Sequence, residues 1–164
     1  MKGEIPMKKM LSLVLVLALC LTAVTAFAAA PSKMVGIINV FVNGAKCNEV
    51  PTAEALAASN VEMLKVVQQG PANYFKTDVN DVFEFSPVKV IVPGDAVVDG
   101  KVEATFSADT KFDANENVQV LLSAEGENGL AWTSYQGVAN AEGDVVATVD
   151  VKVLEEAAFA ALCK

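Results

Sequence analysis

Carboxylate and amide side chains recur at alternate positions in one short stretch of the sequence, which is how a loop presents oxygen ligands to calcium. The residues concerned are Asp109, Asp113, Asn115 and Asn117. An EF-hand loop that starts at the second of these would need glycine at its sixth position and glutamate at its twelfth. Val118 and Ala124 occupy those positions, so the EF-hand is excluded. We predict a solvated turn without a cofactor, in which Asx side chains bond their own backbone. The alternative is a calcium site of another type.

Two further groups of polar side chains could form a binding or catalytic site. The run Asp78, Asn80 and Asp81 is best explained as a turn or a helix cap. The second group falls in two predicted turns that would share one end of a β-sandwich, where we predict a rim that binds a cation or a partner. Its members are Glu125, Glu127, Glu142 and Asp144. A hydrolase would need two acids at a fixed gap in a cleft, and no motif singles out such a pair among 20 acidic residues.

Aromatic side chains offer a second kind of site. Tyr74 and Tyr135 are candidates for a surface that binds a glycan or a peptide. Trp132 lies three positions before Tyr135, so a regular strand places the two rings on opposite faces. We expect Trp132 in the core, since large aromatic side chains bury much apolar surface.

Composition excludes several functions. The chain contains no histidine, which removes Ser-His-Asp and Cys-His catalysis and imidazole metal ligands. All 12 basic residues are lysines and the net charge is −8, so a basic nucleic-acid-binding face is not expected. We predict a protein that is not an enzyme and whose partner is a protein or a glycan rather than a nucleic acid.

The N-terminus reads as an export signal that ends at residue 28. Lys8 and Lys9 form a positive region, and an apolar stretch follows from Leu11 to Val24. Ala26 and Ala28 then supply the small residues of a cleavage site. Cleavage after Ala28 predicts a secreted or periplasmic protein without a stable membrane span. A retained membrane anchor is the alternative.

Two cysteines remain once residues 1–28 are removed. An even count in an exported chain favours a disulfide between Cys47 and Cys163, with two free thiols as the alternative. This bond would tie the end of the chain to the region after its first strand.

The mature chain 29–164 is predicted to be one domain, in which a strand and a helix within 29–87 pack on a β-rich region spanning 88–164. We expect the strand over 34–42, ending at the turn Asn43-Gly44, and the helix over 51–69, begun by Thr52. Alternating apolar residues and turn signals at Asp99-Gly100 and Asn128-Gly129 then indicate antiparallel strands. The predicted strands are 88–92, 96–98, 101–107, 118–123, 130–136 and 145–153, followed by a short helix over 155–162.

The region 88–153 resembles bacterial immunoglobulin-like modules. The resemblance lies in Val118-Gln119-Val120-Leu121-Leu122, in Trp132, and in the alternating valines that follow the turn Glu142-Gly143-Asp144. It implies an antiparallel immunoglobulin-like sandwich, and such modules serve as spacers, adhesins or binding units. We therefore predict a non-catalytic exported protein with a binding, adhesion or envelope-structural role. The alternatives are a small extracellular hydrolase or its inhibitor, and a pilus-type subunit that assembles by strand addition.

Overall fold

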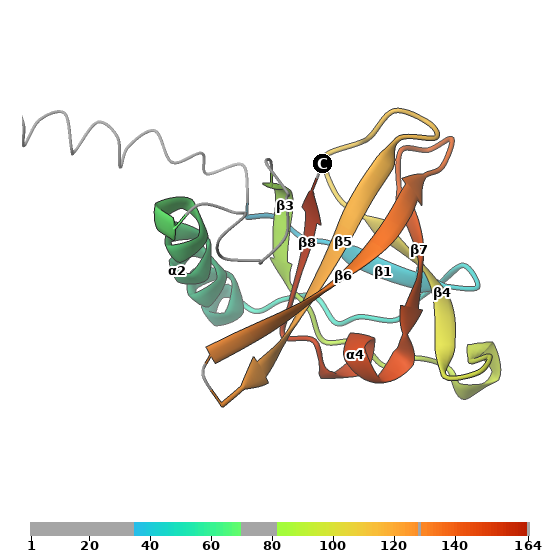
Figure 1. Ribbon diagram of the computed structural model, residues 1–164, viewed down its shortest axis with the longest axis horizontal. Helices are drawn as coiled ribbons and strands as arrows, with labels where there is room; N and C mark the ends of the chain where they lie inside the picture. Colours follow the sequence, from blue (N-terminus) through green and yellow to red (C-terminus); the bar gives the residue numbers. More distant parts are fainter. Residues whose placement is uncertain (1–34, 70–81, 128, 164) are drawn as a thin grey trace, which may run out of the picture. The chain divides into compact units, whose positions relative to one another are not determined.

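A computed structural model describes residues 35–69, 82–127 and 129–163 of the chain. In this part, antiparallel strands form one sheet of eight strands with the order β2-β1-β4-β7-β6-β5-β8-β3 (Figure 1). The strands are β1 (Asn39–Val42), β2 (Ala45–Lys46), β3 (Val82–Pro87), β4 (Lys101–Ser107), β5 (Asn117–Gly126), β6 (Gly129–Ala139), β7 (Val145–Asp150) and β8 (Phe159–Cys163). Helices α2 (Ala53–Gln69) and α4 (Val151–Glu156) and the 3-10 turn η1 (Gly94–Ala96) complete the list. The predicted mainly β, antiparallel class is confirmed. The predicted signal segment, residues 1–28, lies outside the described residues.

The sheet curls so far that its two ends approach each other. Val35 forms a parallel bridge with Phe85 of edge strand β3, and the N–H of Gly36 donates to the Phe85 carbonyl at 2.9 Å. Three residues after Gly36 the same segment enters β1. In a flat sheet, β1 and β3 would be separated by six strand spacings, which is roughly 29 Å. Residues 35–39 reach at most about 14 Å, so the sheet must close around its concave face. The N-terminal strands are therefore members of the sheet rather than a layer packed on it.

The concave face holds the main core, which receives side chains from almost every strand. Val40, Phe106, Val120, Val149 and Leu162 are among its fully or almost fully buried members. They alternate with outward-facing neighbours, as the period of two in a strand requires. Leu154 of α4 is also fully buried in this core.

The convex face carries a second hydrophobic cluster, which we call the outer cluster. Phe85, Leu121, Ala161 and Cys163 are fully buried in it, and Val35, Trp132 and Phe159 pack against them. Phe85, Ala161 and Leu121 are in register across β3, β8 and β5, so they share this face. Helix α2 contacts β3. Because β5 and β8 send buried side chains into the main core as well, these two strands are buried on both faces.

The predicted two-residue turns are confirmed where they lie in described residues. Asn43 and Gly44 have φ of 51° and 76°, and Asp99 and Gly100 have φ of 51° and 74°. Left-handed backbone at both central positions is the geometry that twisted hairpins prefer, and Asn-Gly and Asp-Gly accept it most easily. Asn128 lies outside the described residues, although β5 and β6 pair up to Gly126 and Gly129 on either side of it.

Helix α2 confirms the prediction for 51–69. Its start is set by Thr52, whose Oγ1 accepts the N–H of Ala55 at 3.1 Å. A side-chain acceptor at this position satisfies one of the N–H groups that a first helical turn leaves unpaired.

The predicted C-terminal helix over 155–162 is wrong. Helix α4 ends at Glu156, and Phe159–Cys163 form strand β8 between β5 and β3. Alanine favours helix only weakly, and tertiary contacts override the preference. Here Ala160 and Leu162 fill the main core while Ala161 and Cys163 fill the outer cluster. As a strand between two neighbouring strands, this segment of small residues can bury both of its faces.

Three other boundaries differ from the prediction. Strand β7 stops at Asp150, because the chain turns there into α4. In the segment 96–98, Ala96 ends the 3-10 turn η1, and Val98 forms only a single bridge, to Lys101. The segment 88–92 buries alternate valines as expected but forms only one bridge, from Val90 to Asn48. Its alternation therefore reflects burial of one side rather than membership of a sheet.

Candidate functional site

An apolar groove lies between the start of α2 and the segments that flank β3 and β8. Its volume is about 420 Å³. Three stretches of chain line it: Glu49, Val50, Pro51, Thr52, Ala55 and Ala58; Pro87, Val88 and Lys89; and Ala158 and Phe159. Val50 is 68% exposed, so this groove presents a large apolar side chain to solvent. A concave, mostly apolar site with few polar groups is the usual form of a small-ligand site.

Backbone hydrogen bonds join the three walls of the groove. The N–H of Glu49 donates to the Lys89 carbonyl at 3.3 Å, and the N–H of Val88 donates to the Ala158 carbonyl at 3.0 Å. Ala158 in turn donates to the Ser123 carbonyl of β5 at 2.7 Å. The walls are thus anchored to the sheet, which keeps the groove open in a defined shape.

The charged groups of the groove neutralise each other. Of the lining residues, Glu49 and Lys89 alone carry charge, and their side chains form an ion pair at 3.4 Å. Both are largely exposed, so the pair adds little to stability. The Thr52 hydroxyl already caps α2. What remains is an apolar surface with a neutral rim, which suits an uncharged ligand.

A buried carboxyl group is the most unusual titratable feature of the described residues, and the sequence analysis missed it. Glu84 of β3 is 2% exposed and is in register with Leu162 of β8, so it lies on the concave side of the sheet. Its Oε2 accepts the hydroxyl of Thr110 at 2.9 Å. Gly36 lies against the other oxygen, where a Cβ atom would overlap Glu84 Oε1. The sequence feature that could have indicated this buried carboxyl group is a single glutamate between two phenylalanines in a strand.

Burial raises the pKa of Glu84 above its ordinary value of 4.5. The hydrogen bond from Thr110 lowers this pKa, and the negative charge of Asp109 raises it. The charged form is disfavoured because a low-dielectric surrounding replaces water.

The raised pKa of Glu84 predicts a specific pH dependence of stability. The contribution of this carboxyl is fully present below its unfolded pKa near 4.5, and it is lost as pH rises through the higher folded pKa. Glu84→Gln keeps an acceptor for Thr110 and removes the titration. We expect urea unfolding between pH 4 and 8 to show a smaller loss of stability with rising pH in this variant than in the wild type. Glu103→Gln, at an exposed position of β4, is the control. Identical pH profiles for the two variants would contradict the prediction.

Three of the predicted calcium ligands, Asp113, Asn115 and Asn117, lie in or next to the turn that precedes β5. Asn115 has a left-handed backbone with φ 67°, and its N–H donates to the Ala139 carbonyl at 2.9 Å. The N–H of Asp113 donates to Glu116 Oε2 at 3.1 Å, and Asn117 begins β5. Asp109 lies near Glu84 instead. In the described ranges, no three acidic or cysteine side chains converge on a metal-sized site. The calcium site stays a prediction.

The predicted acidic rim is wrong, because its members lie at opposite ends of one strand. Glu125 and Glu127 lie at the turn between β5 and β6, whereas Glu142 and Asp144 lie at the turn after β6. Strand β6 has 11 residues, so the two turns are roughly 35 Å apart along the strand.

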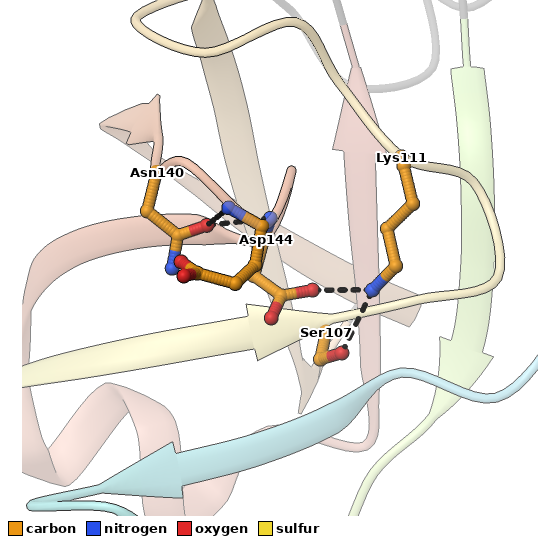
Figure 2. A network of polar contacts seen from close by, with 5 residues as sticks. Ser107, Lys111, Asn140 and Asp144 are labelled. Carbon is orange, nitrogen blue, oxygen red and sulfur yellow. Dashed lines mark hydrogen bonds and ion pairs between the residues drawn. The ribbon is translucent and has the colours of Figure 1, made fainter.

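The second of these turns is instead tied to the loop after β4. The ammonium of Lys111 contacts Asp144 Oδ1 at 2.5 Å and the Ser107 hydroxyl at 3.2 Å (Figure 2). Asn140 Oδ1 accepts the N–H groups of Glu142 and Asp144, both at 3.0 Å. The acid at this turn serves to hold two loops together. Asp78, Asn80 and Asp81 lie outside the described residues.

The two predicted binding tyrosines have different outcomes. Tyr74 lies outside the described residues. Tyr135 packs against the main core, and its hydroxyl donates to Asp150 Oδ2 at 3.0 Å. Burial, followed by this hydrogen bond, raises the pKa of Tyr135 to about 12. Trp132 packs on the opposite face of β6, in the outer cluster, as the spacing predicted. A binding role for Tyr135 stays a prediction.

The predicted disulfide is not formed in the structure, where no bond joins Cys47 and Cys163. Cys47 packs against the main core and its thiol donates to the Ala45 carbonyl at 3.2 Å. Cys163 is buried in the outer cluster, on the other face of the sheet. The two side chains thus contact different clusters, which is why they do not pair.

Comparison with known proteins gives no relative. The chain matches no protein-family model, no curated protein sequence and no solved structure. Among the described residues, no helix combines the length and the apolar character that crossing a bilayer requires.

Proposed function

We propose that this chain is a non-catalytic exported protein of the cell envelope or its surroundings, which binds an uncharged apolar ligand or an apolar protein segment in the groove beside α2. The observation that carries the proposal is the groove itself, with its apolar lining and its single, mutually neutralised pair of charges. The three-part pattern over residues 1–28 supports export. The immunoglobulin-like arrangement belongs to the same proposal, since modules of that kind often serve as binding units.

The alternative of a small hydrolase has less support. Glycoside hydrolysis uses two carboxyl groups that face each other across a cleft. The groove has one carboxylate, Glu49, which is paired with Lys89. The buried carboxyl of Glu84 is not among the lining residues of the groove. The alternative of assembly by strand addition is favoured by one observation: in the described part of the chain, β6 pairs with β7 only at Gly137, Val138 and Ala139.

The test of the groove uses the neutral fluorescent probe N-phenyl-1-naphthylamine. We expect the wild type to bind it with a rise in fluorescence, because the probe leaves water for an apolar site. Ala58→Trp puts a large ring into the groove and should weaken binding by about tenfold or more, as expected for a filled pocket. Ala57→Trp is the matched control, since Ala57 is exposed on the same helix and does not line the groove.

If the two variants bind the probe equally well, or if the wild type does not bind it, the proposal that the groove is a binding site is contradicted. Export is checked on the same preparation by intact mass. A product that begins at Ala29 supports the proposal, and one that begins at Met1 or Met7 contradicts it.

A further inference from the structure

A carboxyl group lies directly beneath the contact that closes the sheet. Val35 forms a parallel bridge with Phe85 of β3, and the N–H of Gly36 donates to the Phe85 carbonyl at 2.9 Å. Glu84, the residue before Phe85, lies on the concave side of β3 and is 2% exposed. Its Oε1 lies where a Cβ atom of residue 36 would be. Residues 35–36, which we call the closing segment, therefore cover the carboxyl group of Glu84.

This buried position suits the neutral form of the carboxyl group better than the charged form. An ionised carboxylate in a low-dielectric site is costly, and it is stabilised when water reaches it. The Thr110 hydroxyl donates to Oε2 at 2.9 Å, and it can donate to the charged form as well. Burial raises the pKa of Glu84, the bond from Thr110 lowers it, and the negative charge of Asp109 raises it further. The need for solvation of the charged form therefore falls on Oε1, on the side of Gly36.

Among the described residues, no cation acts on the pKa of Glu84. Lys111, in the same loop as Thr110, is bound to Asp144 instead. Strand β8 places the apolar Leu162 beside Glu84, and the closing segment is uncharged. Helix α2 also contacts β3, and the charged side chains in its described part are both acidic, namely Glu54 and Glu62. The ionised form of Glu84 thus has no neighbouring positive charge to replace water.

Three neighbours surround Glu84, and the closing segment is the least restrained of them. Strand β8 pairs with β3 on one side and with β5 on the other. The loop after β4 is anchored by Ala108 and Phe112, which are buried in the main core, and the N–H of Phe112 donates to the Gly143 carbonyl at 3.1 Å. The closing segment has a single bridge among the described residues, and the next strand begins only at Asn39. It can leave β3 without breaking either of the other two contacts.

We propose that Glu84 makes the closure of the sheet sensitive to pH: when its carboxyl group loses its proton, the closing segment leaves β3 and water enters beside the carboxylate. The closed form has the raised pKa, so it is favoured at low pH and is lost as pH rises. Because opening releases one proton, the ratio of open to closed molecules grows by up to about tenfold per pH unit, between the ordinary pKa of 4.5 and the higher pKa of the closed form. The open form exposes the edge of β3 and removes Val35 from the outer cluster.

The experiment is amide hydrogen exchange of the predicted mature chain 29–164, followed by NMR between pH 4 and 8, with each rate divided by the intrinsic rate at that pH. The N–H of Gly36 reports the closure. The N–H of Val120 reports global unfolding, since β5 is paired on both sides there. We expect opening at Gly36 to be more frequent than at Val120 at every pH, and to grow by up to about tenfold per pH unit above 4.5.

Glu84→Gln keeps an acceptor for Thr110 and cannot ionise, so Gly36 should keep its low-pH protection over the whole range. Glu103→Gln, at an exposed position of β4, is the matched control and should behave as the wild type. If protection of Gly36 in the wild type stays constant while that of Val120 falls, the proposal is overturned, because Glu84 then reaches water only by global unfolding. A pH-dependent opening that persists in Glu84→Gln also overturns it, because another group would be responsible.

A second variant tests the contact between the closing segment and the carboxyl group. In Gly36→Ala the Cβ atom would overlap Glu84 Oε1, so the amide of residue 36 should exchange faster already at low pH. Gly94→Ala is the matched control, because a Cβ atom there meets no atom within 4 Å, and it should leave the exchange of Gly36 unchanged. A Gly36→Ala protein as well protected as the wild type at low pH would show that the carboxyl group does not lie under the closing segment, and the proposal would fail.

Discussion

Replacing Asn48 by leucine is expected to lower the free energy of unfolding by about 2–6 kcal/mol, because it leaves two buried backbone groups unsatisfied at about 1–3 kcal/mol each. Asn48 is buried beside β1, where its Oδ1 accepts the N–H of Val40 at 2.8 Å and its Nδ2 donates to the Ile38 carbonyl at 3.0 Å. The side chain thus imitates a neighbouring strand for the segment that closes the sheet. Leucine has a similar volume but leaves both backbone groups unpaired.

Urea unfolding with linear extrapolation measures the loss. Asn60→Leu makes the same change at an exposed position of α2 and should alter stability by no more than about 0.5 kcal/mol, the usual range for surface sites. Asn48→Asp keeps the acceptor for Val40 and loses the donor to Ile38, so its effect should be clearly destabilising as well. A loss below about 1 kcal/mol in the leucine variant would show that water satisfies these groups and that the closure does not depend on Asn48.

The second large effect is expected at the outer cluster, where Phe85→Ala should cost about 3–5 kcal/mol, the usual range for a buried phenylalanine. The Phe85 ring is fully buried on the convex face of the sheet. It stacks on Phe159 at a centroid distance of 5.4 Å and packs against Trp132 at 5.8 Å. Truncation removes apolar contacts and leaves a cavity under two aromatic rings.

Trp132 is the single tryptophan of the chain, so its fluorescence reports on this cluster directly. In Phe85→Ala, the emission of the folded protein should shift to the red as water reaches the indole. Phe85→Leu keeps most of the apolar volume and should lose less stability and shift less. If alanine and leucine behave alike and the emission stays at the wild-type position, the convex face is not the buried surface described here.

The sequence predicts local features of this fold well and non-local ones poorly. The turns at Asn43-Gly44 and Asp99-Gly100 are recognisable because two adjacent residues determine their backbone geometry. The start of α2 is recognisable for the same reason, since Thr52 acts on a residue three positions away. Strand β8 is not recognisable, because its alanines become a strand only between β5 and β3, which lie elsewhere in the sequence.

The candidate sites show the same division. The alternating acid and amide side chains from Asp113 to Asn117 fit a turn, which is a local structure, and the chain does turn there. The groove combines residues near positions 50, 88 and 158, and no short pattern could have brought them together. The position of Glu84 in the core depends on its register with Leu162, about 80 positions later in the sequence.

The place of β8 in the sheet has a consequence for the order in which the protein can fold as it is synthesised. Residues 159–163 supply the strand between β5 and β3, which joins the edge strand β3 to the rest of the sheet. A nascent chain that has not yet reached residue 159 leaves the facing edges of β5 and β3 without a partner, together with the apolar surface on both faces that β8 covers. The sheet is therefore completed only when β8, the last of the described strands in the sequence, has been made, and the distant contacts that complete it favour slow folding. Until then, the growing chain is a ready substrate for holding chaperones and for aggregation through its uncovered strands.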